Sequence, residues 1–227
     1  RQFKEITIDL IFGTPLLTDE KWHYNVETAT RLGIPHLSCY ALTSEEGTLL
    51  HHQIKKGLLT EPLQEDQARQ FEWLVQSLEV KGYEHYEISN FALPGHRSRH
   101  NSSYWKGTPY LGLGPSAHSF NGTSRQWNVA NNAIYIRSLQ QDNIPFEQET
   151  LTTVQSLNEY IMISLRTAEG LVNDKLRAHM DEHAYALFTE KIHNYISRGL
   201  LETTGTGMRL TSKGKLFADG IASDLFM

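Results

Sequence analysis

The first 42 residues contain two apolar segments separated by a helical pattern, and this arrangement limits the fold more than any other feature of the chain. The segment EITIDLIFG, residues 5–13, alternates as a strand does, and its run Leu10-Ile11-Phe12 predicts burial on both faces. Apolar residues then recur at helical spacing from Thr18 to Gly33, and HLSCYAL, residues 36–42, follows as a second strand. Strand, helix and strand in this order predict a parallel α/β sheet.

The next hundred residues continue with alternating helical and irregular segments. Helices are expected near 49–56 and 64–81, and YEHYEISNFAL, residues 83–93, alternates as one further strand. Many of the turn-forming Gly, Pro and Ser residues fall in residues 93–125, which predicts long loops around one short extended segment. A helix is expected at about 130–141.

The character of the chain changes at about residue 150. Helical periodicity covers 151–167 and 181–198, and a Gly-Thr-Gly turn then separates two short strands, the second beginning at Met208. Helices followed by a tight hairpin and a last helix predict a winged-helix-like unit. We therefore divide the chain into residues 1–147 and 148–227.

Composition excludes several classes of protein. The 227 residues are 39% hydrophobic and carry a net charge of -5, which argues against a nucleic-acid-binding surface. No apolar run approaches the roughly 20 residues that a bilayer span needs. One cysteine, Cys39, can form neither an internal disulfide nor a zinc or iron–sulfur site, and together with the absence of a signal peptide it predicts a cytoplasmic protein.

Two residues of the predicted strands are candidates for a binding site. Asp9 interrupts an apolar strand shortly before the Gly13-Thr-Pro turn, and a buried carboxylate there needs a partner. Ala41 ends the second strand, where a small side chain leaves room for a flat ligand. Ligands of parallel α/β folds bind at the carboxyl ends of the strands. The alternative is that Asp9 caps a neighbouring turn and that Ala41 has no role.

The segment HNSSYW raises a different question. His100 and Tyr104 lie in polar, turn-rich surroundings that predict a loop rather than an ordinary helix. A histidine beside aromatic rings is suited to be an axial ligand with a stacking wall for a large planar cofactor. It is equally suited to a hydrogen-bonded aromatic corner that holds a loop, and the residues alone do not decide.

Other glycines and histidines are weaker signals. In YLGLGPSAHS, Gly112 and Gly114 favour the close approach of a ligand to the backbone, with His118 nearby. The pairs His51/His52 and His179/His183 have spacings that a metal could use, but solvated surface histidines are the favoured interpretation.

Four segments together resemble one family. IDLIFGTP, LSCYALTSEEGT, YEISNFALPGHRSRHNSSYW and YLGLGPSAHSF occur in the order seen in oxygen-independent coproporphyrinogen III oxidases and the related radical SAM haem chaperones. GLL and LTSKGKLFAD resemble the C-terminal domain of that family. The resemblance implies the C-terminal part of a partial (β/α)6 TIM-like barrel followed by the winged-helix-like domain. It also implies S-adenosylmethionine (SAM) and a [4Fe–4S] cluster held by a CxxxCxxC motif. That motif is absent here, so we expect the chain to begin near the fifth strand and to be inactive alone.

The resemblance also implies roles for individual residues. Asp9 corresponds to a polar residue of the SAM pocket, Ala41 to a position at the adenine, and His118 to a SAM contact where the oxidases have Ile. HNSSYW is similar to the haem-chaperone motif, which makes His100 and Tyr104 candidate haem ligands or contacts and favours haem binding and delivery.

The expected partners are therefore a porphyrin or haem and a haem-accepting protein. The alternative is a true oxidase, which converts propionates to vinyls by oxidative decarboxylation; a nucleic-acid-binding winged helix is disfavoured by charge. Part of a barrel would also leave an unpaired edge at the strand of Asp9, so we expect self-association there.

Overall fold

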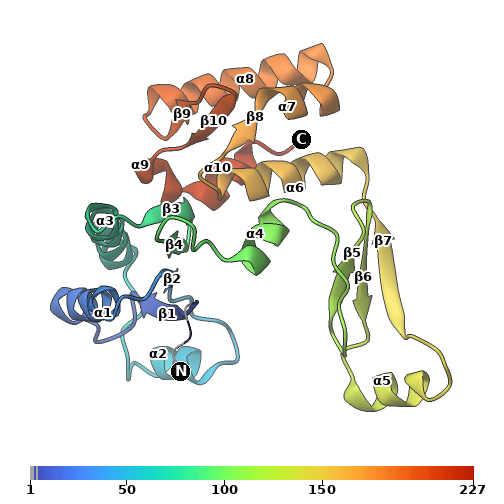
Figure 1. Ribbon diagram of the computed structural model, residues 1–227, viewed down its shortest axis with the longest axis horizontal. Coiled ribbons are helices and arrows are strands. Elements are labelled where there is room, and N and C mark those ends of the chain that lie inside the picture. The colour runs from blue at the N-terminus through green and yellow to red at the C-terminus, as the bar shows by residue number, and fades with distance from the viewer. Residues whose placement is uncertain (1–2, 4) are drawn as a thin grey trace.

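The first half of the chain forms a four-stranded sheet with helices on one face. The computed structural model describes residues 3 and 5–227. Strands β1 (Thr7–Phe12) and β2 (His36–Ala41) are parallel neighbours joined by α1 (Asp19–Arg31), as the sequence predicts (Figure 1). Thr18 starts α1 by accepting a hydrogen bond from the Lys21 backbone N–H. The strand order is β1-β2-β4-β3.

Helices α1 and α3 (Gln64–Val80) pack on one face of this sheet, and α2 (Leu49–Lys55) lies between β2 and α3 in the chain. Their core includes the fully buried Trp22, whose indole N–H donates to the carbonyl of Gln70 at 3.1 Å. Burial of β1 on both faces is wrong, because Ile11 is 51% exposed. Helices α1 and α3 contact β1 on the face that carries Phe12. The core consists of Phe12, Trp22, Val26, Ala29, Ile34, Leu37, Cys39, Phe71, Leu74, Val75, Leu78, Tyr83 and Phe91.

The expected single strand at 83–93 is two strands. β3 (Glu84–Glu87) and β4 (Asn90–Ala92) form an antiparallel hairpin, and β4 pairs antiparallel with β2, so the sheet is mixed rather than parallel. The Glu87 carboxylate closes the turn by accepting the Ser89 backbone N–H at 3.1 Å. A side chain therefore supplies the turn that the sequence does not signal with glycine or proline.

Residues 99–150 contain more regular structure than expected. The segment HNSSYW belongs to α4 (Arg99–Trp105), and a three-stranded antiparallel sheet of β5 (His118–Phe120), β6 (Ser124–Asn128) and β7 (Phe146–Thr150) follows. The expected helix near 130–141 is α5 (Asn132–Leu139), between β6 and β7. Figure 1 shows that these strands project away from the four-stranded sheet and carry α5 at their far end. We call residues 110–150 the arm.

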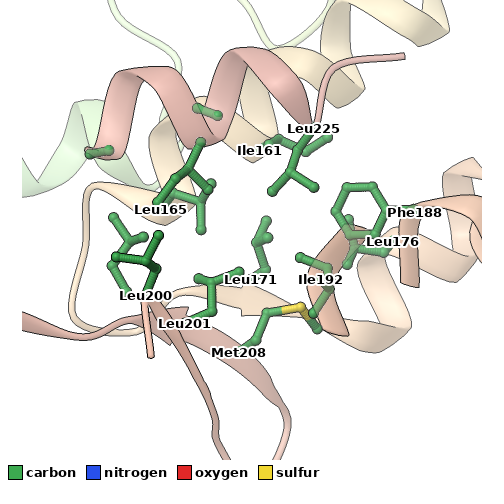
Figure 2. Close-up of a cluster of buried hydrophobic side chains, with 14 of the residues drawn as sticks. Ile161, Leu165, Leu171, Leu176, Phe188, Ile192, Leu200, Leu201, Met208 and Leu225 are labelled. Atoms are coloured by element: carbon green, nitrogen blue, oxygen red, sulfur yellow. The ribbon is translucent and has the colours of Figure 1, made fainter. Parts of the chain in front are cut away.

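The C-terminal residues form the predicted winged-helix-like unit. It contains α6 (Thr153–Leu165), α7 (Asn173–His179), α8 (Glu182–Ser197), α9 (Ser212–Lys215) and α10 (Ala218–Asp224). Strands β8 (Leu171–Val172), β9 (Leu201–Thr203) and β10 (Gly207–Leu210) form an antiparallel sheet in the order β8-β10-β9. Figure 2 shows leucine, isoleucine, methionine and phenylalanine side chains from these elements meeting in one core.

This unit joins the four-stranded sheet at β3. The Ile88 backbone N–H donates to the carbonyl of Arg166, and the Ala168 N–H donates to the carbonyl of Tyr86, each at 3.0 Å. Within the residues described, no helix combines the length and the apolar character needed to cross a membrane.

Candidate functional site

Asp9 and Ala41 lie on neighbouring strands of the four-stranded sheet. In the register of β1 with β2, Asp9 pairs with Ser38 and Phe12 pairs with Ala41. The expectation of a buried Asp9 is wrong, because Asp9 lies in the middle of β1 on the same exposed face as Thr7 and Ile11, opposite the face that packs on the core. Ala41 is also exposed, at the end of β2. The Asp9 charge still reaches the interior, where it reinforces the effect of burial in raising the pKa of Cys39 to about 12.

A hydrogen-bonded chain that sequence reasoning missed crosses the same sheet. Thr7 Oγ1 lies 2.8 Å from His36 Nδ1, and His36 Nε2 lies 2.7 Å from the Tyr86 hydroxyl, which accepts the Ser98 backbone N–H at 3.3 Å. Burial lowers the pKa of His36 and raises the pKa of Tyr86. Both groups are therefore neutral at pH 7, and these hydrogen bonds link β1 and β2 to the start of α4. The alternation of polar and apolar residues in 36–42 could have predicted this, because it places His36 on the face of β2 opposite the helices.

The segment HNSSYW, expected to be a loop, is part of helix α4. The Ser98 hydroxyl accepts the Asn101 backbone N–H at 3.3 Å, which starts the helix, and Gly107 follows its end at a φ of 64°. A helix places residues four positions apart on one face. His100 and Tyr104 consequently meet edge to face, with ring centroids 5.1 Å apart. The Tyr104 ring in turn lies 5.0 Å from that of Tyr110 in the arm.

A large cavity lies beside α4. Its volume is about 980 Å³, and its walls come from α4, the arm, α6 and the start of α7. Tyr104 and Trp105 line the cavity, whereas His100 does not. Among the described residues, the buried Trp105 indole N–H has no hydrogen-bond partner. Such a donor is costly unless a ligand or water satisfies it. Six aromatic residues line the cavity: Tyr86, Tyr104, Trp105, Tyr110, Phe120 and Tyr160.

An ion pair in the cavity wall links the arm to α6. Arg125 on β6 lies 2.7 Å from the Glu159 carboxylate on α6. Burial raises the pKa of Glu159, and the Arg125 charge opposes this effect. Arg97, at the cavity edge, is held by Glu84 at 2.9 Å and by Glu169 at 2.8 Å.

His118 lies elsewhere. It is exposed on β5, and its ring is 6.2 Å from that of Trp127 on β6. Figure 1 shows the arm set apart from the sheet that carries Asp9 and Ala41, so the three predicted SAM contacts are not brought together. The close approach at Gly112 is made by the His118 backbone itself rather than by a ligand, because a side chain at Gly112 would collide with it.

The remaining candidates do not form metal sites. His179 and His183 belong to α7 and α8, so no single helix places them four residues apart. Among the described residues, no three His, Cys, Asp or Glu side chains gather as a metal site would require. A buried thiol whose pKa is raised to about 12 stays protonated, so Cys39 does not fit an iron–sulfur cluster.

Comparison with known proteins gives consistent matches. The model of the HemN C-terminal domain family matches residues 151–217. The heme chaperone HemW of Mycobacterium tuberculosis is 33% identical over 226 residues, which are 98% of this chain and 55% of that protein. HemW of Bacillus subtilis is 30% identical over 220 residues, covering 96% of this chain and 58% of that protein.

The fold has a match among solved structures. The structure of coproporphyrinogen III oxidase (HemN) from Escherichia coli, described as a radical SAM enzyme, matches with a TM-score of 0.76 and 20% identity over 99% of this chain and 55% of that one. The chain therefore spans about half the length of these relatives. The sequence and fold matches agree, and the chain belongs to the HemN/HemW family of radical SAM proteins.

Proposed function

We propose that this chain binds haem for delivery to an acceptor protein, with His100 as axial ligand and Tyr104 as ring contact. The observation that carries the proposal is that Tyr104 lines an aromatic cavity of about 980 Å³ and meets His100, which lies outside the cavity lining, edge to face on α4. Imidazole is a common haem ligand, and aromatic walls suit a flat macrocycle. The relatives named HemW favour the chaperone branch, whereas the likeness to HemN at 20% identity concerns the fold alone.

In this function, each part of the site has a separate task. The imidazole of His100 would hold the iron of the cargo, while Tyr104 and Tyr110 would restrict the tilt of the macrocycle. The Trp105 indole N–H supplies a buried hydrogen-bond donor for a polar group of the cargo. The pair Arg125–Glu159 ties the arm to α6, so loosening it would open one wall for release toward an acceptor.

The SAM and [4Fe–4S] chemistry belongs to the proposal for the whole protein. Asp9 and Ala41 share one sheet and remain our candidate SAM contacts there, whereas His118 would have to contribute from the arm. Cys39 cannot hold a cluster, so we propose that this chain alone does not cleave SAM. We retain the division near residue 147, since the family match begins at 151. A cytoplasmic location also remains a proposal.

Haem titration of the chain, followed through its Soret band, tests the proposed function. We expect His100→Ala to weaken haem binding about tenfold or more and to remove the spectrum of imidazole-ligated iron. His52→Ala is the matched control, because His52 is an exposed histidine on another short helix. An unchanged affinity and an unchanged spectrum in His100→Ala would overturn the assignment of the ligand.

A further inference from the structure

The cavity beside α4 is positively charged although the chain is acidic. Two acidic and five cationic side chains line it, a surplus of three positive charges, whereas the chain as a whole carries -5. A concentrated charge of one sign in a concave site selects ligands of the opposite sign. The acidic residues are Glu159 and Glu169, and the cationic residues are Arg97, Arg99, Lys106, Arg125 and Lys175.

Structural roles account for three of the five cations. Arg97 pairs with Glu84 and Glu169, and Arg125 pairs with Glu159. Lys106 stands at the C-cap of α4, where a cation interacts favourably with the helix dipole. Arg99 and Lys175 remain, and within the described residues neither has a carboxylate within 4.0 Å.

Arg99 is poorly placed for a purely structural role. It is the first residue of α4, where the helix dipole favours an anion and disfavours a cation. It also precedes His100 directly and lines the cavity. Local helix stability therefore gives no reason for this arginine, whereas an anionic group in the cavity does.

Lys175 approaches from a different wall. Its Nζ atom lies 5.3 Å from the centroid of the Tyr160 ring, and the Tyr160 hydroxyl is fixed because it accepts the Val172 backbone N–H at 2.9 Å. A cation resting on a fixed aromatic ring is oriented without being neutralised. Arg99 on α4 and Lys175 on α7 thus offer two separate positive charges to one cavity.

We propose that Arg99 and Lys175 bind the two propionate carboxylates of haem, so that the cavity recognises a tetrapyrrole dicarboxylate rather than an apolar macrocycle. This inference rests on the proposed function. The two cations would set the orientation of the macrocycle in its plane. Charged hydrogen bonds to carboxylates are stronger than neutral ones, so orientation and selectivity come from the same contacts.

Binding of haem and of haem dimethyl ester, whose carboxylates are blocked, tests the inference in the full chain. We expect haem to bind about tenfold more tightly than the ester. Potassium chloride should weaken the binding of haem but not the binding of the ester, because only haem carries the carboxylate charges. Arg99→Gln and Lys175→Gln should each weaken haem binding by about fivefold to tenfold and leave ester binding within about twofold. Lys213→Gln, an exposed lysine outside this cavity, is the matched control.

The outcomes separate this inference from the proposed function. If haem and its ester bind equally tightly and both depend on His100, carboxylate recognition is wrong and haem binding stands. If either glutamine variant weakens both ligands equally, that residue shapes the cavity and does not bind a carboxylate. If the unmodified chain binds neither ligand, both proposals fail.

Discussion

The Nζ atom of Lys215 lies 2.9 Å from Nδ1 of His85, a contact that joins α9 of the C-terminal unit to β3 of the four-stranded sheet. The other ring nitrogen of His85, Nε2, lies 3.0 Å from the carbonyl oxygen of Ile88 and must therefore donate its proton to it. Nδ1 is then left as an acceptor for the lysine ammonium. Burial, followed by the charge of Lys215, lowers the pKa of His85 to about 3, and burial lowers the pKa of Lys215 to about 8.

This contact predicts that mild acid destabilises the fold. The pKa of His85 falls from 6.5 in the unfolded chain to about 3 in the folded one, so only the unfolded chain takes up this proton between those values. The stability that His85 contributes is complete above pH 6.5 and is lost as the pH falls toward 3. The free energy of unfolding decreases by at most about 1.4 kcal/mol per pH unit from this residue. Urea unfolding at pH 7 and pH 5 measures the loss, about 2 kcal/mol from this residue.

The double variant His85→Phe/Lys215→Met should lose less stability over the same pH interval. It removes the titrating imidazole and leaves no buried ammonium without an acceptor. His52→Ala, on the surface, should retain the full dependence. An unchanged pH dependence in the double variant would contradict the assigned role of His85.

Arg166 is predicted to be important because it faces a buried carboxylate. Glu87 is 1% exposed and accepts the Asn90 amide at 2.5 Å, and Arg166 Nε lies 3.6 Å away. Among the described residues, Arg166→Leu would leave this carboxylate with no cation within 4.0 Å and would also remove the exposed pair of Arg166 with Asp219. It should lower the free energy of unfolding by about 3 kcal/mol. Denaturant titration measures the loss.

The matched control is Arg209→Leu. Arg209 pairs with Glu202 at 2.7 Å, but both side chains are nearly half exposed. An exposed pair contributes about 1 kcal/mol or less. An equal loss in the free energy of unfolding in the two variants would show that burial of Glu87 does not determine the effect of Arg166→Leu.

The sequence predicted the regular elements and failed where side chains create local structure. Helical periodicity correctly located α1, α3, α6 and α8, because each is long and has one apolar face. The hairpin of β3 and β4 was missed because alternation continues through a turn that the Glu87 side chain closes. Helix α4 was missed because seven polar and aromatic residues show no period, and its start depends on the Ser98 cap.

The candidate site was predictable only in part. HNSSYW contains the right residues, but their geometry follows from α4, which places His100 beside Tyr104. The cavity also needs Arg125, Glu159 and Lys175, which are far from α4 in the chain and are brought near it by the arm and the C-terminal unit. Contacts of such long range leave no periodic signal in a single sequence.

A glycine of the C-terminal unit is predicted to be irreplaceable for reasons of space. Gly214 in α9 is buried, and a Cβ atom there would collide with the backbone carbonyl of Leu200. Gly214→Ala should therefore cost about 1–3 kcal/mol, since backbone leaves little room to relax. A Cβ atom at Gly220 on α10 meets no atom of the described residues within 4 Å, so Gly220→Ala should be neutral or stabilise slightly. Thermal unfolding compares the two, and equal melting temperatures would contradict the prediction.

The edge of the four-stranded sheet is predicted to promote self-association. Among the strands of the described residues, β1 pairs with β2 alone, so its second edge is open, and Ile11 on it is 51% exposed. Open edges with apolar side chains recruit further strands. We expect the apparent mass in sedimentation velocity to rise with concentration and Ile11→Lys to shift the chain toward monomer, because a charge on the edge opposes pairing.

The matched control is Val80→Lys, which places the same charge on an apolar position that is 89% exposed at the end of α3. If loss of apolar surface in general prevents association, both variants should act alike. If the open edge is responsible, Val80→Lys should associate as the unmodified chain does. A chain that stays monomeric at all concentrations would exclude the edge as an interface.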